Sequence, residues 1–320
     1  MPSAPATRPL RLAMLGMIEG NGHPYSWSSL VNGFDPVAMA KCPYPAILDY
    51  LGNRDPAGEG IEGAQVTHVW TDNPAEAPLV AAVAKIPNVV ARPEDVIGEV
   101  DAVIIATDDG LDHVRRARPF VEAGLPVFVD KPLATSIEEL RTFRDWERNG
   151  ARILSSSGLR YAKEYAGLRG QLPSLGELRW GSAIMSKTWE RYGIHMLEPL
   201  YCAVGGGFES VRVERREKVE LAHLYHQSGA QFTVALIYDG GPGAGTIHLC
   251  GIKADVFVQF QDTYAAFRAQ LVSFVEFLQR GTAPYPFSET VEMMAVLIAG
   301  LRSRAEGSRR VEVAEILSQL

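Results

Sequence analysis

The chain has 320 residues, of which 47% are hydrophobic and 22% charged, and a formal net charge of −7. These values are typical of a globular protein large enough for two domains. A negative chain without a large basic cluster is not expected to bind nucleic acid. The three scattered cysteines predict neither a disulfide framework nor a C-x-x-C site. The sequence has no apolar run of membrane-spanning length, and residues 1–11 lack the apolar core of a secretory signal peptide. We therefore expect a cytoplasmic protein that does not bind membranes.

The first predicted unit is a strand over 12–15, a glycine-rich turn over 16–22 and a helix over 24–32. Backbone N–H groups of such a turn and helix start can bind a phosphate. An ordinary flexible turn has a similar composition, so this turn alone does not establish that a phosphate binds here. The segment 33–63 is rich in proline and glycine and too long for an ordinary connection. It is either a functional loop beside a ligand site or a solvent-exposed decoration.

Short apolar runs alternate with helical segments through the rest of the first half. Such runs are typical of strands buried on both faces of a parallel sheet, and the alternation predicts a doubly wound sheet. The predicted strands are 66–70, 88–90, 103–105, 127–129 and 152–155, and the predicted helices include 75–84 and 136–149.

Two polar positions at predicted strand ends suggest ligand contacts. Asp72 follows the strand 66–70, where an acid commonly accepts the ribose hydroxyls of a dinucleotide, although an aspartate before Asn-Pro is also a routine turn residue. Lys131 directly follows the strand 127–129, and ligands bind outside the carboxyl ends of strands in open α/β sheets. A lysine at this position either takes part in the chemistry or stands there by chance.

The second half is rich in β-strands, with one helix over 193–204 and two more over 264–280 and 287–303. This pattern predicts a mostly antiparallel sheet with helices on one face. The predicted fold class is therefore α/β, a doubly wound parallel sheet followed by an α+β domain with a large, open, mostly antiparallel sheet. The predicted strands of the second sheet are 177–186, 210–215, 219–227, 231–239, 245–250 and 255–260.

His195 and Glu198 form a second candidate site. On a helix these two positions share a face. They could ligate a metal, His195 could transfer protons with Glu198 as its orienter, or the histidine could simply pack near a helix terminus. No third or fourth metal ligand is evident in the neighbouring sequence, so we predict no metal site.

Several of these segments, in this order and spacing, resemble the motifs of one enzyme family. They are Val103–Thr107, His113, Val127–Ala134 and Gly193–Glu198. Asp130-Lys131-Pro132 resembles a Glu-Lys-Pro motif, and Gly193–Glu198 resembles a G-x-H-x-x-D motif. The family is that of the glucose–fructose oxidoreductase and inositol 2-dehydrogenase enzymes, the Gfo/Idh/MocA oxidoreductases.

The resemblance implies an N-terminal Rossmann domain over 1–157 and a substrate-binding and oligomerisation domain over 158–320. It implies hydride transfer between NAD or NADP and a sugar, polyol or related hydroxy compound, in a homodimer or homotetramer. Lys131 and His195 would be the catalytic residues, with Lys131 beside the nicotinamide and His195 transferring a proton. Alcohol oxidation releases a proton together with the hydride, so such a base is required.

Further ligand contacts follow from the strand ends and from the same resemblance. Leu159-Arg160-Tyr161 falls where the family often has an Arg-aromatic pair. The predicted cofactor-binding residues are Gly16, Gly20, Asn21, Gly22, His23, Thr71, Asp72, Ala106, Thr107, His113, Asp130 and Lys131. The predicted substrate-binding residues are Lys131, Arg160, Tyr161, Lys187, Arg191, His195 and Glu198.

The chain departs from the family pattern at three places. Its glycine turn is spaced G-x-x-x-G-x-G, Thr71 stands at the usual position of the ribose-binding acid, and Arg191 replaces an aspartate often found four residues before His195. The choice between NAD and NADP stays open. Arg191 or Lys187 could bind an anionic substrate group, so a sugar acid is an alternative substrate. A non-catalytic dinucleotide- or sugar-binding sensor and an NAD-recycling lyase or glycosidase are alternative functions.

Overall fold

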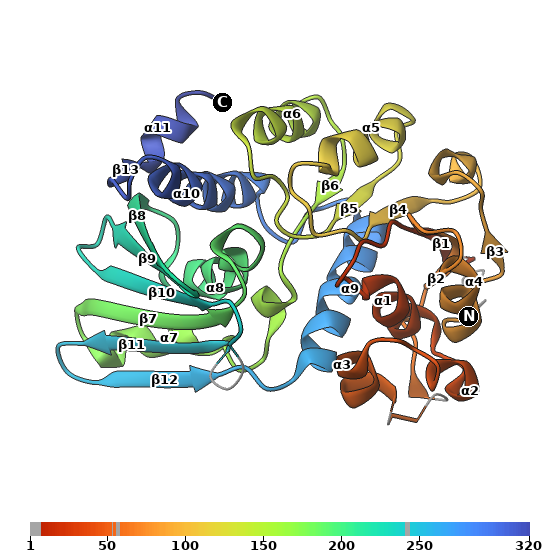
Figure 1. Cartoon of the computed structure of the whole chain (residues 1–320), viewed down its shortest axis with the longest axis horizontal. Helices are drawn as coiled ribbons and strands as arrows, with labels where there is room; N and C mark the ends of the chain where they lie inside the picture. Colours follow the sequence, from red (N-terminus) through yellow and green to blue (C-terminus); the bar gives the residue numbers. More distant parts are fainter. Residues whose placement is uncertain (1–7, 53, 56–57, 241–243) are drawn as a thin grey trace, which may run out of the picture.

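The computed structural model describes residues 8–320 except 53, 56, 57 and 241–243. Two sheets lie side by side, and helix α9 (Thr263–Arg280) returns from the second sheet to pack against α1 (His23–Asn32) beside the first (Figure 1). Within the described ranges, no helix combines the length and apolar character that a membrane span requires.

The first sheet confirms the predicted doubly wound arrangement. Its strand order is β3-β2-β1-β4-β5-β6, and all neighbouring pairs are parallel. The order reverses between β1 and β4, which creates a switch point at the carboxyl ends of these strands. The strands are β1 (Leu10–Leu15), β2 (Ala64–Trp70), β3 (Asn88–Val89), β4 (Ala102–Ile105), β5 (Val127–Val129) and β6 (Ile153–Leu154).

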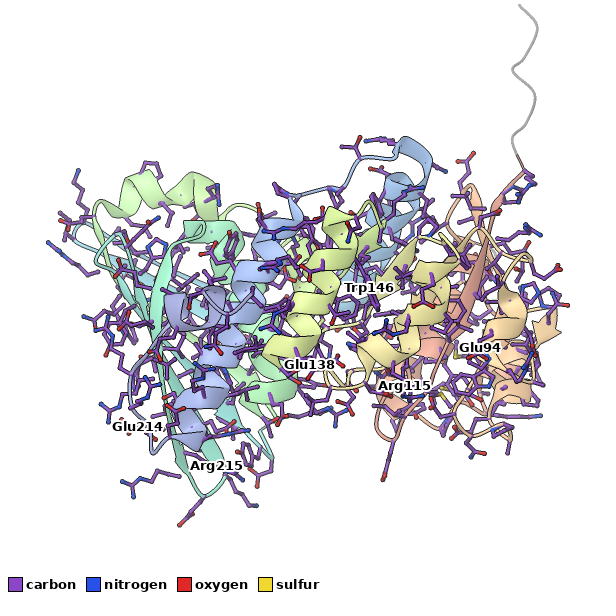
Figure 2. All side chains as sticks on the ribbon, turned by 90° about the horizontal axis from the view of Figure 1, so that it is seen from above. Glu94, Arg115, Glu138, Trp146, Glu214 and Arg215 are labelled. Carbon is purple, nitrogen blue, oxygen red and sulfur yellow. The ribbon has the colours of Figure 1, made fainter. Side chains whose placement is uncertain are left out.

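Helices cover both faces of this sheet. The side chain of Ser136 accepts the Glu139 N–H and thereby caps α6 (Ile137–Arg148). Exposed charged side chains such as Glu94, Arg115 and Glu138 project from the outer surface (Figure 2). Besides α1, the covering elements are α4 (Ala77–Val83), the 3-10 helix η3 (Pro93–Val96), α5 (His113–Glu122) and α6 (Ile137–Arg148).

The described part of the long segment 33–63 packs against the glycine turn and is not merely a solvent-exposed decoration. It forms α2 (Pro36–Met39), α3 (Pro45–Ile47) and the π-helix η1 (Leu48–Gly52). Tyr44 and Ile47 lie so close to Gly22 that a Cβ atom there would approach both to 2.8 Å. The segment therefore packs directly on the glycine turn.

The second sheet is also as predicted, large and mostly antiparallel. Its order is β12-β11-β7-β10-β9-β8-β13, with β10 and β7 parallel and the other described pairs antiparallel. Alternate residues of its strands are buried under the helices on one face. The strands are β7 (Leu178–Ser186), β8 (Phe208–Arg216), β9 (Val219–His226), β10 (Gln231–Ile237), β11 (Thr246–Gly251), β12 (Asp255–Gln259) and β13 (Val311–Glu312).

The helix that carries His195 begins four residues earlier than predicted. It is α8 (Trp189–Val204), and the Trp189 N–H donates to the buried Glu220 carboxylate at 2.7 Å. The Trp189 ring N–H donates to the Leu297 carbonyl of α10 (Phe287–Ala305) at 2.9 Å, so tertiary contacts extend the helix. The remaining elements are the 3-10 helix η4 (Gly158–Tyr161), α7 (Leu168–Leu175), α10 (Phe287–Ala305) and α11 (Val313–Leu317).

Candidate functional site

The glycine turn lies against the ends of two strands. Gly16 directly follows β1 and has a φ of +92°, a region that favours glycine. A Cβ atom at this position would lie 2.7 Å from Cγ2 of Thr107, just beyond β4. The next residue, Met17, donates its N–H to the Asp72 carboxylate at 2.9 Å. The turn and the ends of β2 and β4 therefore meet at the switch point of the sheet.

The start of α1 has already used the hydrogen-bond donors that a phosphate would need. The His23 N–H donates to the Asn21 side chain at 2.9 Å, the next residue is a proline, and the Tyr25 N–H donates to the Gly22 carbonyl at 3.1 Å. By contrast, the N–H groups of residues 18–20 have no hydrogen-bond partner within the described part of the chain. Donors for a phosphate are thus available on the turn and not on the helix.

Asp72, and not Thr71, faces the glycine turn. The Thr71 hydroxyl is buried and donates to the Asn73 carbonyl at 2.8 Å, which holds the turn after β2. The Asp72 carboxylate also accepts hydrogen bonds from Arg116 of α5, at 2.7 and 3.2 Å. A ribose at this position would therefore meet a carboxylate and a guanidinium together.

His113 and Ala106 fix the loops beyond β4 and β5. The buried His113 ring lies 2.7 Å from the Thr107 carbonyl and 3.1 Å from the Leu133 carbonyl. The Ala106 N–H donates to the Leu15 carbonyl and so continues the β1–β4 ladder. Both residues therefore hold the backbone around the site in place. Because the His113 side chain is fully buried, this role is structural.

A cavity of about 270 Å³ opens at the switch point. Among the described residues, two buried hydroxyl oxygens have no hydrogen-bond partner: that of Thr135, which lines the cavity, and that of Thr107, which directly precedes the lining residue Asp108. Such orphaned groups are costly unless a ligand or water satisfies them. The residues lining the cavity include Ile18, Asp108, Gly110, Pro132, Thr135 and Arg191.

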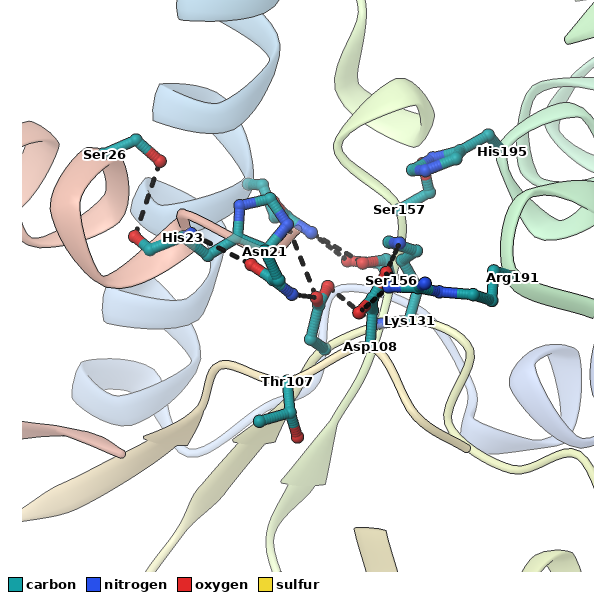
Figure 3. A network of polar contacts seen from close by, with 12 residues as sticks. Asn21, His23, Ser26, Thr107, Asp108, Lys131, Ser156, Ser157, Arg191 and His195 are labelled. Carbon is teal, nitrogen blue, oxygen red and sulfur yellow. Dashed lines mark hydrogen bonds and ion pairs between the residues drawn. The ribbon is translucent and has the colours of Figure 1, made fainter. Parts of the chain in front are cut away.

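Lys131 belongs to a buried ion cluster at the edge of this cavity. Its Nζ lies 3.5 Å from the Asp108 carboxylate, which Arg191 also contacts at 2.7 and 2.8 Å (Figure 3). Burial alone would raise the pKa of Asp108, but the charges of Lys131 and Arg191 outweigh burial and hold that pKa below its usual value. The ion pair between Asp108 and Arg191 also joins the loop after β4 to α8.

His195 points from α8 toward the same cluster and contacts a serine. Its Nδ1 lies 2.6 Å from the Ser157 hydroxyl (Figure 3). The Tyr192 ring centroid lies 4.8 Å from the His195 ring and 4.8 Å from Nζ of Lys131. Burial, and then the positive charge of Lys131, lower the pKa of His195 well below its usual value. His195 is therefore neutral at neutral pH.

Lys187 approaches Tyr192 from the end of β7. Its Nζ lies 2.6 Å from the Tyr192 hydroxyl and 4.2 Å from the ring centroid. Lys187 also has a φ of +62°, the left-handed region that a lysine seldom adopts. Such outliers cluster at functional sites, where the surrounding structure holds them in place.

The described hydrogen bonds of Glu198 go to residues other than His195, although the two share a face of α8. Its carboxylate accepts the Ser157 N–H at 3.1 Å and pairs with Arg160 at 2.9 Å. Arg160 also pairs with Glu289 of α10 at 2.5 Å. Burial raises the pKa of Glu198, although Arg160 opposes the shift. Arg160 and Tyr161 lie in η4, so this network ties η4 to α8 behind the site.

Asp130 is fully buried beneath the site. It accepts the Lys131 N–H at 2.7 Å and an Asn21 side-chain N–H at 3.4 Å, and Nε2 of His23 lies 3.4 Å away. Burial raises the pKa of Asp130 to about 7 and lowers that of His23 to about 3. The His23 ring stacks on Trp27 with 4.2 Å between centroids. The contact between Asp130 and His23 therefore involves a neutral imidazole.

Replacing Asp130 with asparagine should flatten the pH dependence of stability. The folded protein holds this proton up to about pH 7, whereas the unfolded chain releases it near pH 3.8. The free energy of unfolding therefore falls as pH rises between these values, by on the order of a few kcal/mol. Glu139, whose pKa is also raised to about 7, contributes a slope of the same sign in both proteins.

Urea unfolding at pH 5 and pH 8 measures this difference. We expect the Asp130→Asn protein to lose less stability between the two values than the wild type. The exposed Glu94→Gln variant is the control and should retain the wild-type slope. An unchanged slope in Asp130→Asn would show that Asp130 releases its proton at the same pH in both states.

Three residues of the site are not among those predicted. Asp108 follows β4 and Ser157 follows β6. Ligands bind outside the carboxyl ends of the strands, so the argument that singles out Lys131 applies equally to these two residues. Tyr192 directly precedes the Gly193–Glu198 motif, and only its contacts in three dimensions reveal it. The structure brings Lys131, Arg191, Lys187 and His195 together, and it places Arg160 and Glu198 behind them.

The comparisons with known proteins agree with this geometry. Residues 53–156 match the Gfo/Idh/MocA model, described as an oxidoreductase family with an NAD-binding Rossmann fold. A protein of Amycolatopsis mediterranei (strain S699), provisionally named a UDP-kanosamine synthase oxidoreductase subunit, is 30% identical over 171 residues. That match covers 53% of this chain and only 42% of the relative's length.

Solved structures share the fold of almost the whole chain. An oxidoreductase of Agrobacterium radiobacter, solved with NAD+, L-tartaric acid and magnesium, has a TM-score of 0.73 at 16% identity and covers 96% of this chain and 99% of its own. The myo-inositol 2-dehydrogenase of Lactobacillus plantarum has a TM-score of 0.74 at 14% identity, covering 95% and 99%. The resemblance predicted from the motifs is confirmed, because residues 53–156 match the model of the Gfo/Idh/MocA oxidoreductase family, with its NAD-binding Rossmann fold.

Proposed function

We propose that the protein is a cytoplasmic NAD(P)-dependent dehydrogenase or reductase that acts on the CH–OH group of a sugar, polyol or related hydroxy compound. In this proposal residues 1–157 bind the dinucleotide and residues 158–320 bind the substrate. The NAD-binding family match over 53–156 supports the first assignment. The α8 contacts with the cavity edge support the second.

One observation carries the proposal. Lys131 from the end of β5 and His195 from α8 converge on the Tyr192 ring beside the cavity at the switch point. An ammonium and an imidazole that both face one oxygen are the groups that alcohol oxidation or carbonyl reduction needs.

The residues at the switch point fit a dinucleotide. The free N–H groups of residues 18–20 would hold a phosphate, Asp72 with Arg116 would contact the ribose, and the orphaned Thr107 and Thr135 hydroxyls would find partners. A bound nicotinamide would supply the hydride donor or acceptor. Lys131 and His195 would then orient the substrate oxygen and handle its proton.

Positive side chains favour a hydroxyl-rich or anionic substrate. Lys131, Lys187 and Arg191 face the site, whereas Asp108 is the buried carboxylate among them. Lys187 has no carboxylate partner within the described residues, and its Nζ keeps donors beyond the one that Tyr192 accepts. A sugar acid therefore belongs among the first compounds to test.

Replacing Gly16 with alanine should weaken NADH binding at least about tenfold, which corresponds to ~1.4 kcal/mol. The new methyl group would lie 2.7 Å from Cγ2 of Thr107 and would therefore displace the glycine turn from its place beside the cavity. Gly150→Ala is the matched control, because its φ is also +92° but a methyl group there would meet no described atom within 4 Å. Fluorescence titration with NADH and NADPH measures both variants, and equal affinities would contradict the placement.

Hydride transfer itself is tested with NAD+ and NADP+ against a panel of polyols, sugars and sugar acids. Reduction of either cofactor by a panel member supports the dehydrogenase. Dinucleotide binding without turnover would favour a sensor. Cofactor that stays bound through purification, without net redox change while a substrate is cleaved, would favour an NAD-recycling lyase or glycosidase.

We also propose a homodimer or homotetramer formed through the outer face of the second sheet. Trp180 and Phe257 project from that sheet with 41% and 62% of their surfaces exposed. Exposed aromatic side chains on an open sheet are typical of protein interfaces. Light scattering of the wild type and of a Trp180→Glu variant tests this assembly, and a monomeric wild type would refute it.

A further inference from the structure

Ser157 contacts the imidazole of His195 from beyond the end of β6. It is fully buried, and its Oγ lies 2.6 Å from Nδ1 of His195. The same oxygen accepts the Leu159 N–H at 3.0 Å. Ser157 also donates its own N–H to Glu198 at 3.1 Å, so His195 and Glu198 of α8 hold one serine between them. Two contacts therefore fix the hydroxyl, and a third fixes the backbone of the same residue.

The single hydroxyl proton of Ser157 decides the direction of the hydrogen bond to His195. A serine hydroxyl has one proton to donate, and the Leu159 N–H already occupies one of its acceptor sites. If Nδ1 of His195 donated to Ser157, the hydroxyl proton would have no other acceptor in the described structure. An unsatisfied buried donor costs about 1–3 kcal/mol. The hydroxyl therefore donates to Nδ1, and the imidazole proton is on Nε2.

Other groups around His195 are consistent with this arrangement. Arg191 stands where the family often has an aspartate, and its guanidinium pairs with Asp108 and not with the histidine. No carboxylate lies within hydrogen-bond distance of the His195 ring among residues that the structure describes. Burial, and then the positive charge of Lys131, lower the pKa of His195, although the charge of Asp108 opposes the shift. A neutral ring with its proton on Nε2 results.

We infer that Ser157 is a positioning residue that holds His195 as the neutral Nε2–H tautomer, so that His195 donates a hydrogen bond to the reacting oxygen while Lys131 transfers the proton. This inference rests on the proposed function. In the direction of reduction, the carbonyl carbon accepts a hydride from a reduced nicotinamide dinucleotide, and the oxygen takes a proton from the Lys131 ammonium. The resulting amine regains its proton from solvent, and His195 keeps the same protonation throughout.

The tautomer can be measured without turnover. In the full chain labelled with 15N-histidine and free of added cofactor, two-bond N–H correlations distinguish Nε2–H from Nδ1–H. The His195→Asn variant identifies which signals belong to His195. We expect Nε2–H in the wild type and in Ser156→Ala, and a mixture or Nδ1–H in Ser157→Ala. An Nδ1–H wild type, or a tautomer unaffected by Ser157→Ala, would overturn the inference.

Kinetics supply the second measurement. Ser157→Ala keeps the backbone N–H that Glu198 accepts, so we expect a folded protein whose kcat falls roughly ten- to a hundredfold at nearly constant KM. Ser157→Thr, which keeps a hydroxyl, should recover most of kcat, and Ser156→Ala, one residue away and equally buried, should resemble the wild type. Full activity in Ser157→Ala would refute the positioning role. A wild type inactive on every panel compound would instead refute the proposed function, and the tautomer would still be readable.

Discussion

Replacing Lys131 with methionine should lower kcat roughly 10²- to 10⁴-fold while leaving the dissociation constant for NADH nearly unchanged. Methionine keeps much of the length of the side chain but cannot transfer a proton. Lys131 lies at the edge of the cavity, and in the variant Arg191 can still pair with Asp108. The cavity should therefore keep its shape. Steady-state kinetics and an NADH titration of the same preparation separate the two quantities.

Two further variants interpret the result. Lys131→Arg retains the positive charge beside Asp108 but binds its proton too strongly to release it, so its kcat should also be low. Lys218→Met removes a lysine that is 70% exposed in the turn between β8 and β9 and should resemble the wild type. Equal turnover in wild type and Lys131→Met would remove the lysine from the mechanism. Turnover retained only in Lys131→Arg would assign it an electrostatic role alone.

Replacing Arg160 with methionine should destabilise the protein by about 3–5 kcal/mol, the cost typical of breaking a buried ion pair on one side. The Arg160 side chain is only 10% exposed and pairs with Glu198 and Glu289. Without it, burial would raise the pKa of Glu198 further. The loss of stability should therefore grow as pH rises, because Glu198 must then be buried as a charge.

Unfolding by urea at two pH values measures this effect. The matched comparison is the double variant Arg160→Met with Glu198→Gln, which removes both charges and keeps an acceptor for the Ser157 N–H. We expect the double variant to regain much of the lost stability, since neutral replacement of a buried pair is often tolerated. A double variant as unstable as the single one would show that the loss comes from packing and not from charge.

Hydrophobic periodicity and turn chemistry were sufficient to predict most of the fold. The runs at 103–105 and 127–129 are short and wholly apolar, and both are central strands of the first sheet. The alternation in 219–227 and 231–239 predicts strands with one buried face, as β9 and β10 have. These features are local, so the sequence alone reveals them.

Elements fixed by distant contacts were harder to predict. The first turn of α8 depends on Glu220, which is 31 residues away and caps the Trp189 N–H. The short helices within 33–63 pack on the glycine turn through Tyr44 and Ile47, and the proline-rich sequence gives no period that predicts them. Tertiary contacts override local propensity at both places.

The candidate site was predictable only where its residues belong to local sequence features. Lys131 stands at a strand end, and His195 belongs to a recognisable motif. One of the open interpretations gave His195 a partner on the same helix, Glu198, because spacing along one helix can be read from sequence. The observed partner is Ser157, which is 38 residues away and meets His195 only because η4, which Ser157 caps, packs against α8. Charge pairing between Asp108 and Arg191 likewise depends on tertiary structure.

The most direct test of the central claim is the transfer of deuterium from a carbon-deuterated substrate to the cofactor. The substrate is the panel compound that reduces NAD+ or NADP+ fastest, labelled at the oxidised carbon, and mass spectrometry measures the label in the reduced dinucleotide. The proposed function predicts deuterium in the cofactor with the wild type and almost none, in the same time, with Lys131→Met. Oxidation of the substrate without label in the cofactor, or equal labelling by the two proteins, would contradict the account.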